Sequence, residues 1–185
     1  MALTPTKKIP LGFIAPDFNL INPLLNHEQS LKNLKGDKAT LIVFMCNHCP
    51  YVIHVLPELV KLANEYEEKG ISVIGINSND IQSHPDDSPE NMIKLIHKYN
   101  IPFPYLFDET QEIAKAYTAE CTPDFSIFNK EKKCVYRGQL DSSRPGNNKD
   151  INGSDIRKVF NQIINKELVS KEQIPSIGCN IKWKL

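Results

Sequence analysis

The stretch KATLIVFMCNHCPYVIHVL, residues 38–56, combines three patterns that together decide the fold. Lys38 to Met45 is a run of mostly β-branched and aromatic apolar residues, which is typical of a strand buried on both faces. Two cysteines, Cys46 and Cys49, follow without a gap. Apolar residues then recur at helical spacing and predict one buried helix face, made of Val52, Val55, Leu56, Leu59, Val60 and Ala63. We therefore expect a buried strand that leads through a C-x-x-C pair into a helix.

Strands and helices continue to alternate after this unit. The expected elements are, in order, a strand over 71–76, a helix starting at Ser88-Pro89, a short strand over 103–107, a helix from Asp108 through Tyr117, a hairpin of 125–128 and 133–139, and a helix over 156–164. Asp108 and Gln111 are spaced as a capping box. The segment from Gln173 to Leu185 shows no clear period.

This order predicts the fold class. Strands joined through helices imply parallel pairing with right-handed crossovers, and the hairpin adds an antiparallel edge. We expect an α/β three-layer sandwich with a mixed central sheet flanked by helices. A chain of 185 residues suits one such domain, so we predict a single domain over residues 1–185. About residues 1–37 form an N-terminal extension, and about 170–185 form a C-terminal tail.

Charge and cysteine content limit the functions to be considered. The chain has 22 Lys and Arg residues against 22 Asp and Glu residues, so bulk charge argues against a nucleic-acid partner or an anionic membrane. No secretory signal and no membrane-spanning apolar run is visible. We therefore expect a cytoplasmic protein. Its five cysteines are an odd number and do not suggest a disulfide framework in a reducing compartment.

The C-x-x-C pair admits a redox interpretation. Cys46 stands where the predicted strand ends and the helix begins, where unpaired amide N–H groups and the helix dipole favour a thiolate. Cys49 follows one helical turn later, close enough to close a small disulfide ring. His48 can stabilise the Cys46 thiolate, and Pro50 is compatible with the first helical turn. This arrangement predicts Cys46 as the nucleophile and Cys49 as the resolving thiol.

These residues resemble the thioredoxin superfamily. Its dithiol faces a cis-proline, and Thr122-Pro123 lies where that proline is expected, before the strand 125–128. The N-terminal extension, with its Ala15 to Phe18 segment, and the insert over 78–107 resemble the branch shared with AhpC/TSA-type peroxiredoxins and membrane-anchored thioredoxin-like reductases. The stretches CNHCPYV, CTPDF, YRGQLDSSRPG and PSIGCNIKWK look like thioredoxin family proteins of that branch. The resemblance implies a thioredoxin-like fold and a substrate groove shaped by Thr122 and Pro123.

Two departures from the neighbouring families matter. A peroxiredoxin has a threonine three residues before its peroxidatic cysteine and an arginine near the cis-proline. Here Cys46 takes the place of the threonine, and Thr122 aligns with the arginine. Thioredoxins also carry a buried acid in the strand before the dithiol, and Leu41 to Met45 contains none. Asn77, Asn79 and Asp80 are expected near the site only from their position.

Other cysteines leave alternatives open. Cys46 and Cys49, with Cys121 or Cys179 and with His48, could hold zinc, but no second closely spaced ligand pair is present. Cys121, two residues before Pro123, is either an additional redox thiol or a small buried side chain. Cys179 is either an extra resolving thiol on a tail that folds over the site, or part of a tail held by ordinary packing.

The expected activity is therefore thiol–disulfide oxidoreduction in the cytoplasm, as part of redox homeostasis. Substrates would be protein or small-molecule disulfides, and an unidentified reductase would regenerate the dithiol. Neither an organic cofactor nor a metal is needed, because the dithiol itself carries two electrons. Two alternatives remain: a peroxiredoxin-like thiol peroxidase with an antioxidant role, and a redox-sensing binding module.

Overall fold

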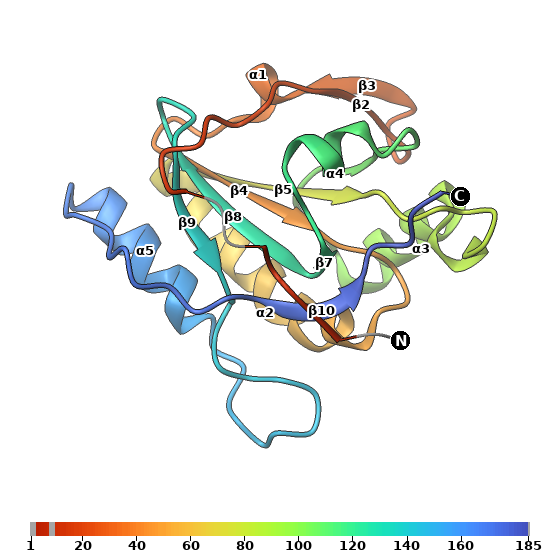
Figure 1. Ribbon diagram of the computed structural model, residues 1–185. Helices are drawn as coiled ribbons and strands as arrows, with labels where there is room; N and C mark the ends of the chain where they lie inside the picture. The colour runs from red at the N-terminus through yellow and green to blue at the C-terminus, as the bar shows by residue number, and fades with distance from the viewer. Residues whose placement is uncertain (1–2, 8–9, 185) are drawn as a thin grey trace.

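The structure is a computed structural model that describes residues 3–7 and 10–184. Within these residues a seven-stranded sheet carries helices on both faces, and a second sheet has three strands (Figure 1). The strands are β1 Leu3–Pro5, β2 Asn19–Asn22, β3 His27–Ser30, β4 Ala39–Phe44, β5 Ile71–Asn77, β6 Tyr105–Phe107, β7 Cys121–Thr122, β8 Asp124–Asn129, β9 Cys134–Gly138 and β10 Ile177–Asn180. The α-helices are α1 Leu31–Leu34, α2 Pro50–Tyr66, α3 Pro89–Tyr99, α4 Glu112–Ala116 and α5 Ser154–Ile164. Glu67–Lys69 and Pro85–Asp87 form single 3₁₀ turns.

The central sheet is mixed, as the sequence predicts. Its order is β3-β2-β6-β5-β4-β8-β9. β4 pairs in parallel with β5, and β5 with β6, whereas the pairs to either side are antiparallel. At the carboxyl end of β4, Phe44 lies opposite Asp124, the first residue of β8. This register brings the segment before β8 next to the segment after β4, where the two cysteines lie.

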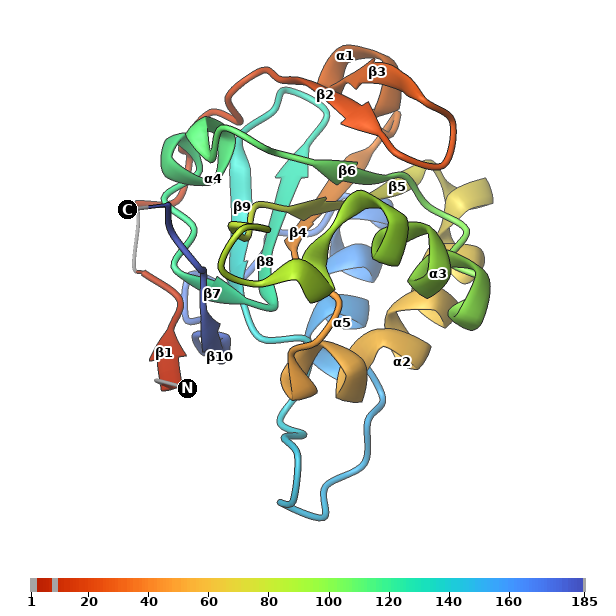
Figure 2. The same ribbon diagram turned by 90° about the vertical axis from the view of Figure 1, so that its right-hand side faces the viewer.

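Alternating side chains of the strands build two cores. Leu41 and Val43 face α2, α3 and α5, while Ile42 and Phe44 face α4 and the N-terminal segments. Figures 1 and 2 show α2 and α5 together on one side of the sheet and α4 on the other. Every residue of β4 is buried, which is the condition under which a strand reads as a continuous apolar run. The expected three-layer α/β sandwich is confirmed.

Local signals place the ends of the helices next to the site. α2 begins at Pro50, which needs no amide hydrogen there, and the chain after it turns at Gly70 with a φ of 83°. α3 begins after Ser88, whose side chain accepts a hydrogen bond from the Asn91 amide. The Ser88-Pro89 start of α3 was expected from the sequence, whereas α2 begins at Pro50 and not at Cys46. Among the described residues, no helix has both the length and the apolar character needed to cross a membrane.

The expected capping box before α4 is wrong. The carboxylate of Asp108 accepts hydrogen bonds from the amides of Ile113 and Ala114, at 3.4 and 2.9 Å. The side chain of Gln111 instead donates to the carbonyl of Lys182, 2.8 Å away in the C-terminal tail. Gln111 therefore holds the tail. α4 begins at Glu112, the residue after Gln111, and not at Asp108 as expected.

Both ends of the chain form strands that the sequence analysis did not find. In the N-terminal extension, β2 and β3 make a hairpin that joins the central sheet through β6. In the tail, β10 lies between β1 and β7 in the three-stranded sheet, and it pairs antiparallel with both of them (Figures 1 and 2). This small sheet lies beside the end of β4 and covers the two cysteines of the C-x-x-C pair.

Candidate active site

The C-x-x-C pair lies against Thr122. Cys46 follows the end of β4, and Cys49 is the residue directly before α2. The Cys46 sulfur is 3.3 Å from the Thr122 hydroxyl oxygen, and the Cys49 sulfur is 3.3 Å from the Thr122 carbonyl oxygen. The peptide bond between Thr122 and Pro123 is cis, as the resemblance implies. The structure thus brings Cys46, Cys49, Thr122 and Pro123 together.

Cys179 is the third sulfur in this cluster. β10 pairs with β7 so that Cys179 lies opposite Thr122, and its sulfur is 2.8 Å from the sulfur of Cys49. The tail therefore folds over the dithiol. It is held by backbone pairing as well as by the apolar packing expected for it. Cys46 is 1% exposed and Cys49 is 0% exposed, so no substrate sulfur reaches either of them while β10 is in place.

The three thiols differ in acidity. Hydrogen bonding from the Cys46 thiol lowers the pKa of Cys49 to about 5 against the opposing effect of burial, with help from the Cys179 thiol and the Val52 amide. The same bond to Cys49, burial and the nearby charge of Asp87 raise the pKa of Cys46. Burial and the bond to Cys49 raise the pKa of Cys179 to about 12. These directions favour a thiolate at Cys49 over one at Cys46 or Cys179.

The sequence predicts the thiolate at Cys46, whereas these pKa directions favour Cys49, and the start of the helix gives the physical reason. The expectation of a Cys46 thiolate required the helix to begin at Cys46. Instead α2 begins at Pro50, and Cys49 is its N-cap. The unpaired amides of the first turn therefore lie at Cys49, where they stabilise negative charge.

A buried carboxylate that the sequence analysis missed lies beside Cys46. Asp87 is 0% exposed, and its carboxylate accepts hydrogen bonds from the Asn47 amide and the Asn79 side chain, both at 2.7 Å. His48 Nδ1 lies 2.9 Å from Asp87 Oδ2. His48 is thus paired with Asp87, whereas the sequence predicted that it would stabilise Cys46. Asp87 ends a polar stretch that has no period. The one sequence signal that could have found it is its position directly before the Ser88 helix start.

The three residues expected near the site from position alone have structural roles. The Asn77 side chain donates to the Asp87 carbonyl at 2.8 Å, and Asn79 holds the Asp87 carboxylate. The backbone amide of Asp80 donates to the Lys182 carbonyl at 2.8 Å. These residues orient Asp87 and hold the tail, and their side chains are not placed to take a proton from Cys49.

One set of donor atoms could hold a metal ion. A sulfur of Cys46, a ring nitrogen of His48 and a carboxylate oxygen of Asp87 lie within 4.8 Å of one another, and these are ligand types that zinc accepts. Both oxygens of Asp87 already accept hydrogen bonds from protein groups. We therefore treat these residues as a hydrogen-bonded network and assign no metal to them.

The Cys121 sulfur makes its hydrogen-bond contacts outside the cluster of Cys46, Cys49 and Cys179. Its sulfur contacts the Thr6 hydroxyl at 3.8 Å and the Pro123 carbonyl at 3.7 Å. Burial and the neighbouring charge of Asp124 raise its pKa far above the ordinary value. These contacts fit the small buried side chain that was one of its two expected roles.

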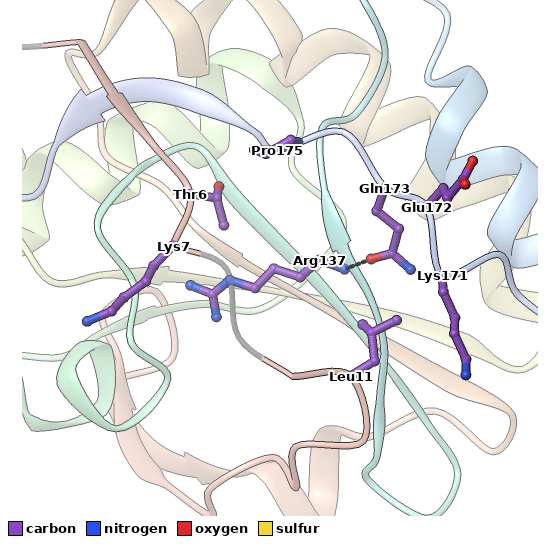
Figure 3. A pocket seen from close by; sticks show the side chains of 8 residues that line it. All are labelled: Thr6, Lys7, Leu11, Arg137, Lys171, Glu172, Gln173 and Pro175. Carbon is purple, nitrogen blue, oxygen red and sulfur yellow. Dashed lines mark hydrogen bonds between the residues drawn. The ribbon is translucent and has the colours of Figure 1, made fainter.

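Arg137 links Asp124, the residue after the cis-proline, to the segment that precedes β7. Arg137 donates to the carbonyls of Tyr117 and Thr118 and to the Asp124 carboxylate, at 2.7, 2.8 and 3.1 Å. Figure 3 shows Arg137 among the residues that line a cavity of about 400 Å³, together with Thr6 and Gln173. The lining residues of this cavity include none of the cysteines, so it lies apart from the dithiol.

Asp124 should leave a signature in the pH dependence of stability. Burial raises its pKa to about 6 even though Arg137 opposes this effect. The folded state therefore binds the proton more tightly than the unfolded chain does, and the added stability is lost as the pH rises from about 4 to 6. We expect the difference in unfolding free energy between wild type and Asp124→Asn to change by up to about 3 kcal/mol across this window. Urea unfolding at several pH values measures it, and parallel curves for the two proteins would contradict the assignment.

The dithiol lies next to a cis-proline and links a buried strand of a mixed sheet to the following helix, and this arrangement defines a thioredoxin-like protein. The sequence profile of the AhpC/TSA family matches residues 11–137, and the chain belongs to this family. A crystal structure of a conserved protein from Geobacillus kaustophilus superposes with a TM-score of 0.97 at 52% identity, covering 100% of this chain and 97% of that one. The thioredoxin domain of a thiol-disulfide oxidoreductase from Bacteroides vulgatus superposes with a TM-score of 0.64 at 21% identity, covering 83% and 99%, and shares the fold.

Curated relatives have two kinds of name. The thiol-disulfide oxidoreductase ResA of Halalkalibacterium halodurans is 26% identical over 57% of this chain, and the match spans 55% of the relative's length. ResA of Bacillus thuringiensis is 26% identical over 71% of each chain. A putative peroxiredoxin bcp of Helicobacter pylori is 30% identical over 61% of this chain and 68% of the relative.

Proposed function

We propose that the protein is a thiol–disulfide oxidoreductase whose redox couple is Cys46 and Cys49. One observation carries the proposal: the sulfurs of Cys46 and Cys49 both lie 3.3 Å from Thr122, directly before the cis-proline Pro123, and the pKa of Cys49 is lowered to about 5 there. A thiolate attacks disulfides, and a second thiol two residues away can resolve the product. The names of the ResA relatives support the same chemistry.

The roles of the two cysteines follow from their acidity. The Cys49 thiolate attacks one sulfur of a substrate disulfide and forms a mixed disulfide, and the other substrate sulfur leaves as a thiolate that takes a proton from water. Cys46 then loses its proton and attacks the Cys49 sulfur, which releases the second substrate thiol and closes a Cys46–Cys49 disulfide. Two electrons pass from the dithiol to the substrate. Cys49 thus takes the nucleophilic role that the sequence predicted for Cys46.

Regeneration needs an external dithiol. A reductase of unidentified structure returns two electrons to the Cys46–Cys49 disulfide, and the cycle requires neither a metal nor an organic cofactor. In a reducing cytoplasm, which the cysteine content suggests, the net direction is reduction of protein or small-molecule disulfides. Turnover of insulin disulfides with dithiothreitol as reductant tests the proposal. Catalysis above the uncatalysed rate supports it, and a rate equal to dithiothreitol alone contradicts it.

A thiol peroxidase is the second candidate, because the chain belongs to the AhpC/TSA family and holds one thiolate of low pKa. A peroxidase would form a sulfenic acid on Cys49 as its first product. The double variant Cys46→Ser/Cys179→Ser, treated with hydrogen peroxide and dimedone or with glutathione disulfide, separates the candidates, because Cys179 lies 2.8 Å from the Cys49 sulfur and would resolve either product. Under our proposal dimedone labelling stays slow while a mixed disulfide with glutathione forms readily, and the opposite result favours the peroxidase.

The pH profile of the first step provides a further test. With a pKa of about 5, Cys49 is fully ionised above about pH 6. The rate of single-turnover attack on glutathione disulfide should therefore be flat from about pH 6 to 9, and it should fall about tenfold per unit below pH 5. Stopped-flow kinetics on the reduced protein measure it. A rate that still rises through pH 8 would indicate an ordinary thiol, whose pKa is about 8.5.

A further inference from the structure

β10, near the C-terminus, pairs with the edge of β7 that lies beside the cis-proline Pro123. In the described residues, β10 pairs antiparallel with β7, with Cys179 opposite Thr122 and Asn180 opposite Cys121. An extended peptide that added to this edge would take the same place as β10. In Figures 1 and 2 β10 lies directly beside β7, over the start of α2. The chain therefore presents one of its own sulfurs to Cys49 in the position of a substrate sulfur, at 2.8 Å.

The close approach depends on a glycine. A Cβ atom at Gly178 would lie 1.9 Å from the Thr122 carbonyl oxygen and 3.0 Å from the Pro123 nitrogen, distances at which no side chain fits. Next to it, the Ser176 hydroxyl donates to the Pro123 carbonyl at 2.7 Å, and the Thr6 amide donates to the Ser176 carbonyl at 2.8 Å. Gly178 and the hydrogen bonds of Ser176, which we call the seat of β10, thus hold the strand where the Cys179 sulfur contacts the Cys49 sulfur.

We propose that Cys179 is a third redox thiol, which forms an alternative disulfide with Cys49 and pins β10 over the site. The proposal rests on the proposed function, since it uses Cys49 as the nucleophile. It goes further in giving the dithiol a second intramolecular partner from the tail.

The chemistry balances with a disulfide as oxidant. The Cys49 thiolate attacks the oxidant R–S–S–R, forms Cys49–S–S–R and releases one R–S⁻, which takes a proton. Cys179 then loses its proton and attacks the Cys49 sulfur, releasing the second R–S⁻, which takes that proton. The Cys49–Cys179 bond forms as two thiols lose two electrons to the oxidant. Cys46, also in contact with Cys49, can attack this bond at the Cys49 sulfur and release Cys179, which turns the pinned disulfide into the Cys46–Cys49 disulfide without net electron transfer.

The two disulfides have different consequences for access. A Cys49–Cys179 bond joins β10 covalently to the start of α2, so the covered site stays covered. A Cys46–Cys49 bond leaves β10 held only by its hydrogen bonds and packing, which can open to admit a partner. The tail thus protects the oxidised Cys49 from other thiols until Cys46 releases it.

The test uses Cys46→Ser, which leaves Cys179, 2.8 Å away, as the cysteine of the described residues that contacts the Cys49 sulfur. The reduced protein is treated with glutathione disulfide, quenched with iodoacetamide and mapped by mass spectrometry. We expect a Cys49–Cys179 disulfide without retained glutathione, and Cys134→Ser in the same background should behave identically. Glutathione that stays on Cys49 while Cys179 is alkylated overturns the inference. In wild type, a short pulse of glutathione disulfide should yield both disulfides, which serves if the variant does not fold.

A second variant tests the seat without changing a cysteine. Gly178→Val in the Cys46→Ser background should slow closure of the Cys49–Cys179 bond at least about tenfold, with glutathione accumulating on Cys49, while circular dichroism reports an unchanged fold. Unchanged closure overturns the role of the strand. If Cys49 does not react with glutathione disulfide in any of these proteins, the proposed function fails and the inference fails with it. If wild type closes Cys46–Cys49 but Cys179 never pairs, only the inference fails.

Discussion

Replacing Cys49 with serine is expected to reduce steady-state disulfide turnover at least about 10³-fold, because it removes the group that attacks the substrate. Cys46→Ser is expected to impair turnover through a different step. It keeps the Cys49 thiolate and loses Cys46, so the first attack proceeds, Cys49 is then trapped in the disulfide with Cys179, and the slow step becomes reduction of that disulfide. Insulin reduction measures turnover, and intact-mass spectrometry of glutathione adducts measures the first attack.

The matched comparison lies between the two single variants. Cys49→Ser should accumulate no glutathione adduct at about pH 7, because burial and the nearby charge of Asp87 still raise the pKa of the remaining Cys46 thiol after its bond to the Cys49 thiolate is lost. Cys134→Ser is the control, since its sulfur contacts the Tyr136 carbonyl at 3.4 Å and no residue of the site. An adduct that forms on Cys46 in Cys49→Ser as fast as on Cys49 in wild type would restore the order that the sequence predicted.

The largest expected effect on stability comes from Arg137→Ala, a loss of about 3–5 kcal/mol in unfolding free energy. Arg137 has 4% of its side chain exposed and Asp124 has 1%, so removing the guanidinium leaves a carboxylate buried without its counter-charge. The same change leaves the carbonyls of Tyr117 and Thr118 without their donor. Urea unfolding at about pH 7.5, above the Asp124 pKa of about 6, measures the loss.

A double variant separates charge from packing in that loss. Asp124→Asn combined with Arg137→Ala removes the buried charge as well as its partner, and it should be more stable than Arg137→Ala alone. A loss below about 1 kcal/mol in the single variant would show that the Asp124 carboxylate reaches water or is protonated. Equal stability of the single and double variants would assign the loss to the carbonyl bonds.

The parts of the fold that the sequence predicts are those with a local signal. All residues of β4 except Thr40 are apolar because both of its faces are covered, α3 starts at a serine followed by a proline, and the β8–β9 hairpin has a turn between two apolar runs. β10 lacks such a signal. Its four residues, IGCN, include Gly178. Glycine is required there only because a Cβ atom at this position would lie 1.9 Å from the Thr122 carbonyl oxygen. That requirement comes from a contact with a segment more than 50 residues away.

The candidate site divides in the same way. The spacing of Cys46 and Cys49 and the position of Thr122-Pro123 are local patterns, and the structure brings all four residues together. Asp87 was missed because its role depends on three hydrogen bonds from residues that the fold brings to it. The pKa directions favour a thiolate at Cys49 where the sequence predicts one at Cys46, because C-x-x-C does not state on which residue the helix begins. A shift of that start from Cys46 to Pro50 moves the unpaired amides to Cys49.

Equilibration of the wild-type protein in graded glutathione buffers, followed by alkylation and mass-spectrometric mapping of all five cysteines, tests the redox couple most directly. We expect a Cys46–Cys49 disulfide that forms and disappears reversibly with the buffer potential, with Cys121 and Cys134 alkylated throughout once the protein is unfolded. If Cys46 and Cys49 both remain alkylatable at every ratio of oxidised to reduced glutathione, the pair is not a redox couple and the proposed function is wrong.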